Sequence, residues 1–344
     1  MLSEHGSRGD GWRPSASRER LVQRAAMKSR IRVFVAVRGV LEVDTPALVR
    51  RGVTDVNLAT VTARLEDQEL FLHTSPEYAM KRLLAAGLGD IYQLCPVFRA
   101  EERSALHNPE FTMLEWYRLG YSMDRLIEEV AALLDTAMQA CGAAPRPLRR
   151  LRYCDAFLQC FGVNPLDAPR ETLAKLALEA GLTGDAAASL TRDGLLDFLV
   201  GVRVGPTLGH DCWLALTHYP ASQAALAQLD PHDPTVALRF EMYADGVELA
   251  NGCEELANAE EQAARFAADN RERIARGVPQ RTADERLLAA LSAGLPACAG
   301  VALGVDRALM IATGARRIDE VISFTIEQAR RRHEQRLPPT RVWS

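Results

Sequence analysis

The segment FRAEERSALHNPEFTMLEWY, residues 98–117, carries the side chains of this sequence that are best suited to chemistry. It is predicted to form a strand, a short polar loop and a second strand. Because side chains alternate along a strand, Arg99 and Glu101 point to one face, where Phe111 of the partner strand joins them. A solvated face with ion pairs would explain one Arg-x-Glu alone. It does not explain why His107 adds a donor beside an aromatic ring.

Such a face suits a nucleoside triphosphate. A rigid arginine fork binds phosphate oxygens, a carboxylate accepts from a purine amine, and an aromatic ring stacks on the base. The sequence contains neither a GxxxxGK[ST] loop nor a GxGxxG turn after a strand. The phosphates would therefore be held by side chains and a metal ion.

A second pattern, VALRFEMYADGVELANG, predicts a hairpin that turns at residues 245–246. This register places Met242 opposite Leu249. It makes Glu241 and Glu248 diagonal neighbours on one face, roughly 7 to 8 Å apart. Two such carboxylates can share a Mg²⁺ ion that is bound to phosphate. The alternative is an ordinary hairpin with two exposed glutamates.

A third pattern, AGVALGVDRALMIATG, predicts a strand that turns into a helix at Gly304, with Arg307 in the first helical turn. Free backbone N–H groups and the helix dipole favour an anion at this point. An arginine at a helix start is unfavourable unless a negative group offsets it. The pattern therefore favours a bound phosphate.

The surrounding elements predict an α+β fold, an antiparallel sheet flanked by helices, because strands follow one another as hairpins rather than alternating with helices. A helix capped by Ser17 is expected over residues 18–38, followed by a strand that stops at Pro46. Another helix is expected to have Ser75 as N-cap and Pro76 at its first position. A charged helix is predicted near 257–277, whereas residues 146–229, with one helix near ETLAKLALEAG, carry no recognisable chemistry.

Composition fits a globular protein of 344 residues, of which 48% are hydrophobic and 25% charged. Seven scattered cysteines with no C-x-x-C pair indicate neither a disulfide framework nor a zinc ribbon. The formal charge of -4 argues against a protein that wraps long nucleic acid. Because no apolar run approaches the ~18 residues of a membrane span and no secretory signal is recognisable, a cytoplasmic location is expected.

Three segments resemble the signature motifs of class II aminoacyl-tRNA synthetases of the lysyl type. GVLEVDTPAL resembles motif 1, FRAEERSALHNPEFTMLEWY motif 2 and GVALGVDRALMIATG motif 3, while TSPEYAMKRLL and GVELANGCEEL are similar to the family's amino-acid pocket. The resemblance implies the following boundaries: a catalytic domain over 18–329, motif 1 at about 20–46, motif 2 at about 91–118, motif 3 at about 299–314, a flexible N-terminal tail over 1–17 and a basic C-terminal tail over 330–344.

The resemblance also implies residue roles. Arg99 would hold the α-phosphate and the substrate carboxylate, and Arg307 the γ-phosphate, which makes these two the expected catalytic residues. Glu101 would bind the adenine amine and Phe111 the adenine face. The other expected positions are His107, Asn108, Glu248, Leu249 and Gly304 for ATP, Glu241 and Glu248 for magnesium, and Ser75, Pro76, Glu77, Tyr117, Asn251, Glu255 and Ala302 for the amino acid.

Within the amino-acid set, Glu255 is the expected partner of the substrate's side-chain ammonium, because a buried cation requires a paired charge. Tyr117 and Asn251 have an alternative interpretation as plain core and turn residues.

Three features depart from full-length lysyl-tRNA synthetases. Ala302 stands where those enzymes usually have glycine, and Leu106 stands where they have arginine. The motif 1 helix begins within the first twenty residues, so no anticodon-binding barrel is expected before it. These features resemble stand-alone paralogues that activate a β-lysine with ATP and Mg²⁺ and join it to a lysine of elongation factor P.

The same resemblance implies a homodimer, buried partly by the helix that contains Met27, Ile31 and Phe34 and by the strand that follows it. No membrane or anticodon-type tRNA binding is expected. A truncated synthetase that charges tRNA and a non-catalytic interaction module are the alternatives. The second is disfavoured because the arginines, glutamates and phenylalanine of the expected ATP site all occur together.

Overall fold

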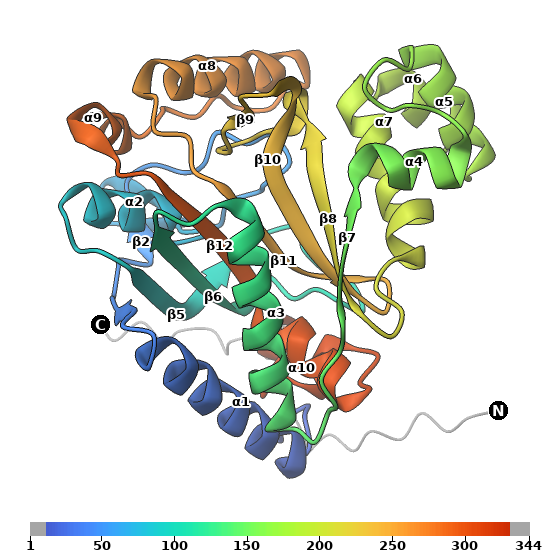
Figure 1. The fold of residues 1–344 in the computed structure, drawn as a ribbon. Helices are drawn as coiled ribbons and strands as arrows, with labels where there is room; N and C mark the ends of the chain where they lie inside the picture. The colour runs from blue at the N-terminus through green and yellow to red at the C-terminus, as the bar shows by residue number, and fades with distance from the viewer. Residues whose placement is uncertain (1–11, 331–344) are drawn as a thin grey trace, which may run out of the picture.

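A nine-stranded sheet, mostly antiparallel, runs through the centre of the molecule (Figure 1). The computed structural model describes residues 12–330. From edge to edge the strands are β1 (Leu41–Glu42), β5 (Ile91–Phe98), β6 (Glu110–Leu119), β12 (Cys298–Gly304), β11 (Val247–Glu254), β10 (Asp233–Ala244), β8 (Trp213–Pro220) and β7 (Leu148–Arg152), and β9 (Leu229–Asp230) pairs with β10. Only the edge pairs β1–β5 and β7–β8 are parallel. The predicted α+β class is confirmed.

Helices α1 (Arg18–Ala36), α3 (Met123–Gln139) and α10 (Val305–Thr313) pack together against the sheet (Figure 1). Ser17 caps α1 as predicted, since its hydroxyl accepts from the Arg20 N–H at 3.2 Å. Met27, Ile31 and Phe34 are buried in this chain's own core. A dimer contact through this helix and the strand after it, which stays a prediction, would therefore use the exposed side of the helix. The exposed apolar side chains of this segment are those of Val22, Val33, Val37 and Leu41.

A small sheet of β2 (Leu48–Val49), β4 (Gln68–Leu72) and β3 (Thr62–Leu65) lies beside α2 (Glu77–Ala85). The predicted hairpin is present, with Glu66 at its turn in the left-handed region (φ 53°). The strand expected up to Pro46 is wrong in length, because only Leu41–Glu42 pair with β5. The start of α2 also differs. Pro76 is the N-cap, although the Ser75 hydroxyl still accepts from the Glu77 N–H at 3.0 Å.

A helical unit fills most of the region to which the sequence assigned no role. It consists of α4 (Tyr153–Phe161), α5 (Arg170–Glu179), α6 (Gly184–Ser189), α7 (Arg192–Leu199), a π-turn (Val200–Val204) and a 3₁₀ turn (Gly205–Thr207). The unit has its own apolar core and lies beside β7 and β8 (Figure 1). The remaining elements are α8 (Ala259–Ala275), α9 (Glu285–Gly294), the 3₁₀ turns Ala221–Gln223 and Ile318–Glu320, and α11 (Ile326–Arg330).

The β10–β11 hairpin contains a bulge that alternation alone does not predict. Met242 lies opposite Ala250, so the predicted pairing of Met242 with Leu249 is wrong. Leu249 is the extra residue, and both it and Ala250 pack in the main core. Because of this extra residue, Glu248 and Asn251 share the face opposite the core although they are three positions apart.

The predicted C-terminal tail, except for residue 330, and residues 1–11 of the predicted N-terminal tail lie outside the described residues. Within residues 12–17, the Ser15 hydroxyl donates to the Ile322 carbonyl at 2.9 Å. Between residues 12 and 330 there is no helix of the length and apolar character needed to span a bilayer.

Candidate active site

A cavity of about 1030 Å³ opens against the strands β6, β10, β11 and β12 and reaches the N-terminal end of α2. It brings together all seven residues predicted to hold an amino acid. These are Ser75, Pro76, Glu77, Tyr117, Asn251, Glu255 and Ala302, together with Arg99 of the predicted ATP site.

Glu115 lies at the closed end of this cavity and is almost wholly buried, with 2% of its surface exposed. Its carboxylate accepts hydrogen bonds from the hydroxyls of Ser75 and Tyr117, at 2.6 and 2.7 Å. Burial, together with the nearby charge of Glu77, raises the pKa of Glu115 to about 8. Sequence reasoning did not include Glu115 among the site residues.

Lys81 is a second residue that sequence reasoning missed. Its ammonium lies 2.7 Å from Glu77 Oε1 and 2.6 Å from Glu255 Oε2, and the side chain is 2% exposed. Burial opposes the charge, but Glu255 and Glu77 raise the pKa of Lys81 well above its ordinary value. The sequence could have indicated that Lys81 belongs to the site, because the chain has only three lysines and Lys81 follows Glu77, a predicted site residue, by one helical turn.

The closed end therefore holds three carboxylates, those of Glu77, Glu115 and Glu255, around one protein ammonium. The partner of Glu255 in this structure is Lys81, whereas the sequence-based expectation was a substrate ammonium. Two carboxylates remain without a matching protein cation among the described residues of this cluster. This surplus suits a substrate that carries amine groups.

Glycine and alanine on β12 give the floor of the cavity its shape. A Cβ atom at Gly300 would lie 2.3 Å from Glu255 Oε1 and 2.4 Å from a ring atom of Tyr117, so only glycine fits between them. Ala302 pairs with Asn251 on one side and Glu115 on the other. Its methyl group therefore projects among groups that are expected to contact the amino acid.

Asn251 is oriented by Arg239, a further residue that the sequence did not single out. Arg239 Nε donates to Asn251 Oδ1 at 3.3 Å, which leaves the Asn251 amide N–H groups available to the cavity. The same guanidinium contacts the Tyr219 ring, with 4.3 Å between the guanidinium carbon and the ring centroid. This stacking fixes the plane of the arginine.

Arg99 joins the cavity to the predicted ATP site. Its guanidinium carbon lies 5.2 Å from the Phe111 ring centroid, and its Nη1 lies 3.0 Å from Glu102 Oε1. Its Nε atom is buried without a hydrogen-bond partner. Glu101, which was expected beside Arg99, is exposed in the following turn, because Glu102 takes the position next to the guanidinium.

Arg307 occupies the first turn of α10, with Gly304 as N-cap, as predicted. Its Nη1 donates to the Glu248 carbonyl at 3.1 Å, and its Nη2 donates to His107 Nε2. Burial and Arg307 lower the pKa of His107, which therefore stays neutral and can accept from the guanidinium. The Glu248 carbonyl and the His107 ring, which belong to different segments, thus hold the Arg307 guanidinium beside the motif 2 loop.

Two other predicted ATP-site residues have structural contacts of their own. Asn108 is 6% exposed, donates to the Glu110 carbonyl at 2.6 Å and accepts from the Ile326 N–H at 3.1 Å. Leu249 is the bulge residue and points into the core. Any contact of Leu249 with a nucleotide would involve its backbone.

The pair Glu241 and Glu248 fits a divalent cation. Burial, with Glu241 as a like-charged neighbour, raises the pKa of Glu248 to about 7, and a bound cation would relieve that repulsion. The Glu241 oxygens accept from Arg239 Nη2 at 2.6 Å and from the Tyr243 hydroxyl at 2.7 Å. Among residues 12–330 no three His, Cys, Asp or Glu side chains converge as a metal site. Magnesium here would need phosphate oxygens as further ligands.

A family model described as tRNA synthetases class II (D, K and N) matches residues 10–328. The chain belongs to this family. Among curated class II relatives, the protein named "Elongation factor P--(R)-beta-lysine ligase" from Klebsiella pneumoniae (strain 342) is 48% identical over 324 residues, which cover 92% of this chain and 98% of the relative. Proteins of the same name from Salmonella arizonae and Salmonella typhi show the same identity and coverage.

In class II terms, α1 and β1 correspond to the expected motif 1. The strands β5 and β6 with their loop correspond to motif 2, and β12 with α10 corresponds to motif 3. The cavity lies beside motif 2 and motif 3, with α2 and β11 completing the end that holds the three carboxylates.

Proposed function

We propose that this chain is an ATP-dependent ligase that activates (R)-β-lysine, or lysine, as an aminoacyl-adenylate and transfers it to a lysine side chain of elongation factor P. The observation that carries the proposal is the cavity itself. One end has a surplus of carboxylate for an amine-bearing substrate, and Arg99, which also lines the cavity, contacts the ring of Phe111. The names and the nearly full-length coverage of the relatives support the choice of reaction.

In the first step the amino-acid carboxylate attacks the α-phosphorus of ATP, and pyrophosphate leaves. Arg99 would balance charge on the α-phosphate and Arg307 charge on the γ-phosphate, so catalysis comes from positioning and electrostatic stabilisation. Magnesium, when bound at Glu241 and Glu248, would neutralise phosphate charge. Asn251, held by Arg239, would orient the substrate.

In the second step the acceptor's ε-amine attacks the adenylate carbonyl. The new amide bond forms, the amine loses a proton and AMP leaves with the former carboxylate oxygen. The mouth of the cavity carries exposed groups of both signs, namely Arg50, Arg51, Arg82, Asp197 and Glu285. A protein surface with its own mixed charges can pair with both signs, whereas a polyphosphate would meet the carboxylates unfavourably.

We further propose a cytoplasmic homodimer. The exposed apolar residues Val22, Val33 and Val37 lie on the outer side of α1, and Leu41 follows them. Exposed apolar groups gathered on one surface are typical of protein interfaces. A second copy of this chain would cover them, which uses the predicted helix and the strand after it.

The proposed function is tested in two stages. Exchange of labelled pyrophosphate into ATP should depend on β-lysine or lysine. With ATP, Mg²⁺ and β-lysine, intact elongation factor P should then gain the mass of one lysyl unit. Strong charging of bulk tRNA with an unmodified factor would instead identify a tRNA synthetase, and no exchange with either amino acid would exclude an activating enzyme.

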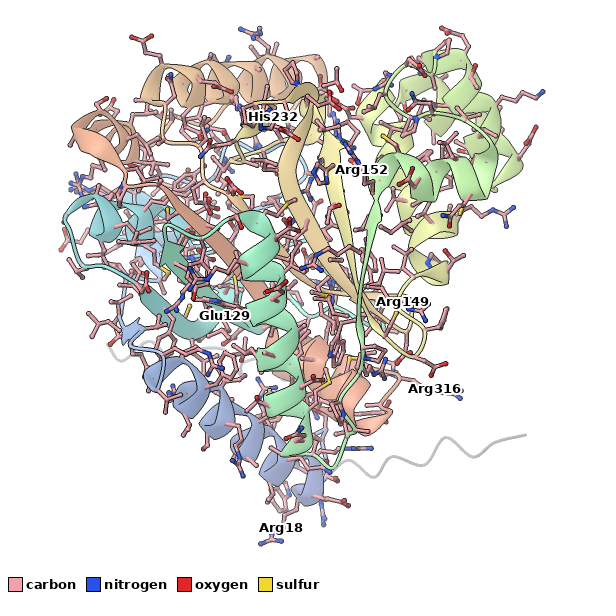
Figure 2. The ribbon with its side chains drawn as sticks, in the orientation of Figure 1. Arg18, Glu129, Arg149, Arg152, His232 and Arg316 are labelled. Carbon is pink, nitrogen blue, oxygen red and sulfur yellow. The ribbon has the colours of Figure 1, made fainter. Side chains whose placement is uncertain are left out.

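The docking of the acceptor is tested separately. The double variant Arg50→Ser/Arg51→Ser should lower kcat/KM for elongation factor P several-fold and leave pyrophosphate exchange unchanged. Arg149→Ser is the matched control, because Arg149 is also exposed but lies on β7, an edge strand of the nine-stranded sheet (Figure 2), whereas Arg50 and Arg51 follow β2 of the small sheet. Equal effects of both variants would show a general charge effect and no docking at the mouth.

A further inference from the structure

A buried ion pair connects the three segments that correspond to motifs 1, 2 and 3. Arg24 of α1 pairs through Nη1 with Asp306 Oδ1 and donates through Nη2 to the Thr112 hydroxyl at 2.7 Å. The other Asp306 oxygen accepts from the Thr112 N–H at 2.7 Å. The Asp306 side chain is 2% exposed and that of Arg24 is 16% exposed. The three groups therefore form a closed triangle.

Two corners of the triangle adjoin residues of the proposed ATP site. Thr112 follows Phe111 on β6, and Asp306 precedes Arg307 in the first turn of α10. The last β6–β12 pair is Met113 with Gly304. At Thr112 the partner strand has already turned into α10, and the Asp306 carboxylate accepts the backbone N–H that the strand no longer satisfies. The carboxylate thus sets the distance between Phe111 and the start of α10.

Helix α1 also holds the far end of α10. Arg20 Nη2 donates to the carbonyl of Thr313, the last residue of α10, at 2.8 Å. With Arg24 at the first turn and Arg20 at the last, α1 fixes both the position and the tilt of the short helix that carries Arg307. A short helix that is held at both ends cannot rotate its first turn freely.

We propose that Arg24 and Asp306 are positioning residues for the nucleotide. They hold Arg307 at the distance from Phe111 that a triphosphate spans, with no contact to the nucleotide of their own. This inference rests on the proposed function for the assignment of Arg307 to the γ-phosphate. It predicts that loss of the ion pair weakens binding only of a nucleotide that carries the third phosphate, since Arg307 would reach that phosphate alone.

The test compares three nucleotides by calorimetry in the presence of Mg²⁺. Arg24→Met should weaken ATP binding about tenfold and change the Kd values of ADP and AMP less than twofold. Arg24→Lys, which keeps the charge but cannot bridge Asp306 and Thr112 together, should lie between the wild type and Arg24→Met. Arg32→Met is the matched control. It removes an ion pair from the same helix, to Glu42 at 3.0 Å, that touches neither β6 nor α10.

Equal weakening of ATP, ADP and AMP would show a general structural defect and overturn the proposal, as would an unchanged Kd for ATP in folded protein. If Arg24→Met does not fold, two other variants can be used. Arg24→Met/Asp306→Asn removes both buried charges, and Thr112→Val removes the hydrogen bond from Arg24 to the Thr112 hydroxyl. Binding of ATP, ADP and AMP to either variant tests the proposal in the same way. The nucleotide series needs no amino acid or acceptor. Failure of the proposed ligase activity in the wild type would therefore be distinguishable from failure of this inference.

Discussion

The ammonium of Lys81 lies 2.6 Å from the carboxylate of Glu255 at the closed end of the cavity. The protein thus places a lysine of its own in a pocket that we propose for a lysine-like substrate. A buried carboxylate with an internal partner stays in position when no substrate is bound. The substrate amine would join this charge cluster, where Glu77 and Glu115 supply further carboxylate.

Glu255→Gln should raise KM for β-lysine in pyrophosphate exchange far more than KM for ATP, because a neutral amide cannot balance an ammonium. The variant should also be destabilised, since Lys81 loses one of its two carboxylates. Glu254→Gln is the control, because the neighbouring Glu254 binds the Met123 N–H at 2.8 Å outside this cluster. Equal effects on both KM values would move Glu255 out of the amino-acid site.

The exchange reaction should depend on the ionisation of Glu115. Burial raises the pKa of this carboxyl from 4.5 to about 8, so at lower pH it is protonated and cannot attract an ammonium. We expect kcat/KM for the amino acid to rise as the pH increases through about 8. Glu115→Gln should lose this rise, whereas the titration of the substrate's own amine is the same for both proteins. A profile shared by wild type and variant would contradict the assignment.

Glu115 should also make stability depend on pH. Its raised pKa means that the folded state prefers the neutral carboxyl, so this contribution is fully present below about pH 4.5 and is lost as the pH rises through about 8. Relative to wild type, Glu115→Gln should therefore gain in Tm between pH 5 and pH 8. Thermal unfolding of both proteins across that range measures the effect, and a constant difference would refute it.

Arg307→Ala should lower pyrophosphate exchange by about 10²- to 10³-fold, the range for removal of one charge-stabilising group in an active site. The fold should persist, because the side chain makes polar contacts to His107 and Glu248 and fills no apolar core. Circular dichroism and Tm provide the control. Exchange at the wild-type rate would exclude Arg307 from the phosphate site.

Ala302→Gly should improve the use of α-lysine relative to β-lysine. The Ala302 methyl lies between Asn251 and Glu115, and a change of one methylene in a pocket typically gives about 1 to 3 kcal/mol of discrimination. The measurement is the ratio of kcat/KM for the two isomers in exchange. If that ratio stays constant, the isomer preference depends on other residues.

Local patterns predicted much of this site. The turn from β12 into α10, with Gly304 and Arg307 in their places, is encoded within sixteen consecutive residues, and so is the face of β6 that carries Phe111. Pairings between distant segments were not predictable in the same way. Nothing local indicates that Lys81 of α2 meets Glu255, the residue after β11.

Of the helical unit beside β7 and β8, only the helix near ETLAKLALEAG, which is α5, was predicted. The helices are only 6 to 10 residues long, so most present too few turns for a clear apolar period. An apolar stripe on a helix also does not show which partner covers it. In α1, α3 and the sheet cover Met27 and Ile31.

The extra residue at Leu249 makes the β10–β11 hairpin tolerant of one particular change in chain length. Exchanging Leu249 for another apolar residue alters only how one core position is filled. Deleting it would leave Glu248 and Asn251 two positions apart, and regular alternation also places such residues on one face. Homologous sequences aligned across this hairpin should therefore tolerate both different apolar residues and a gap at position 249.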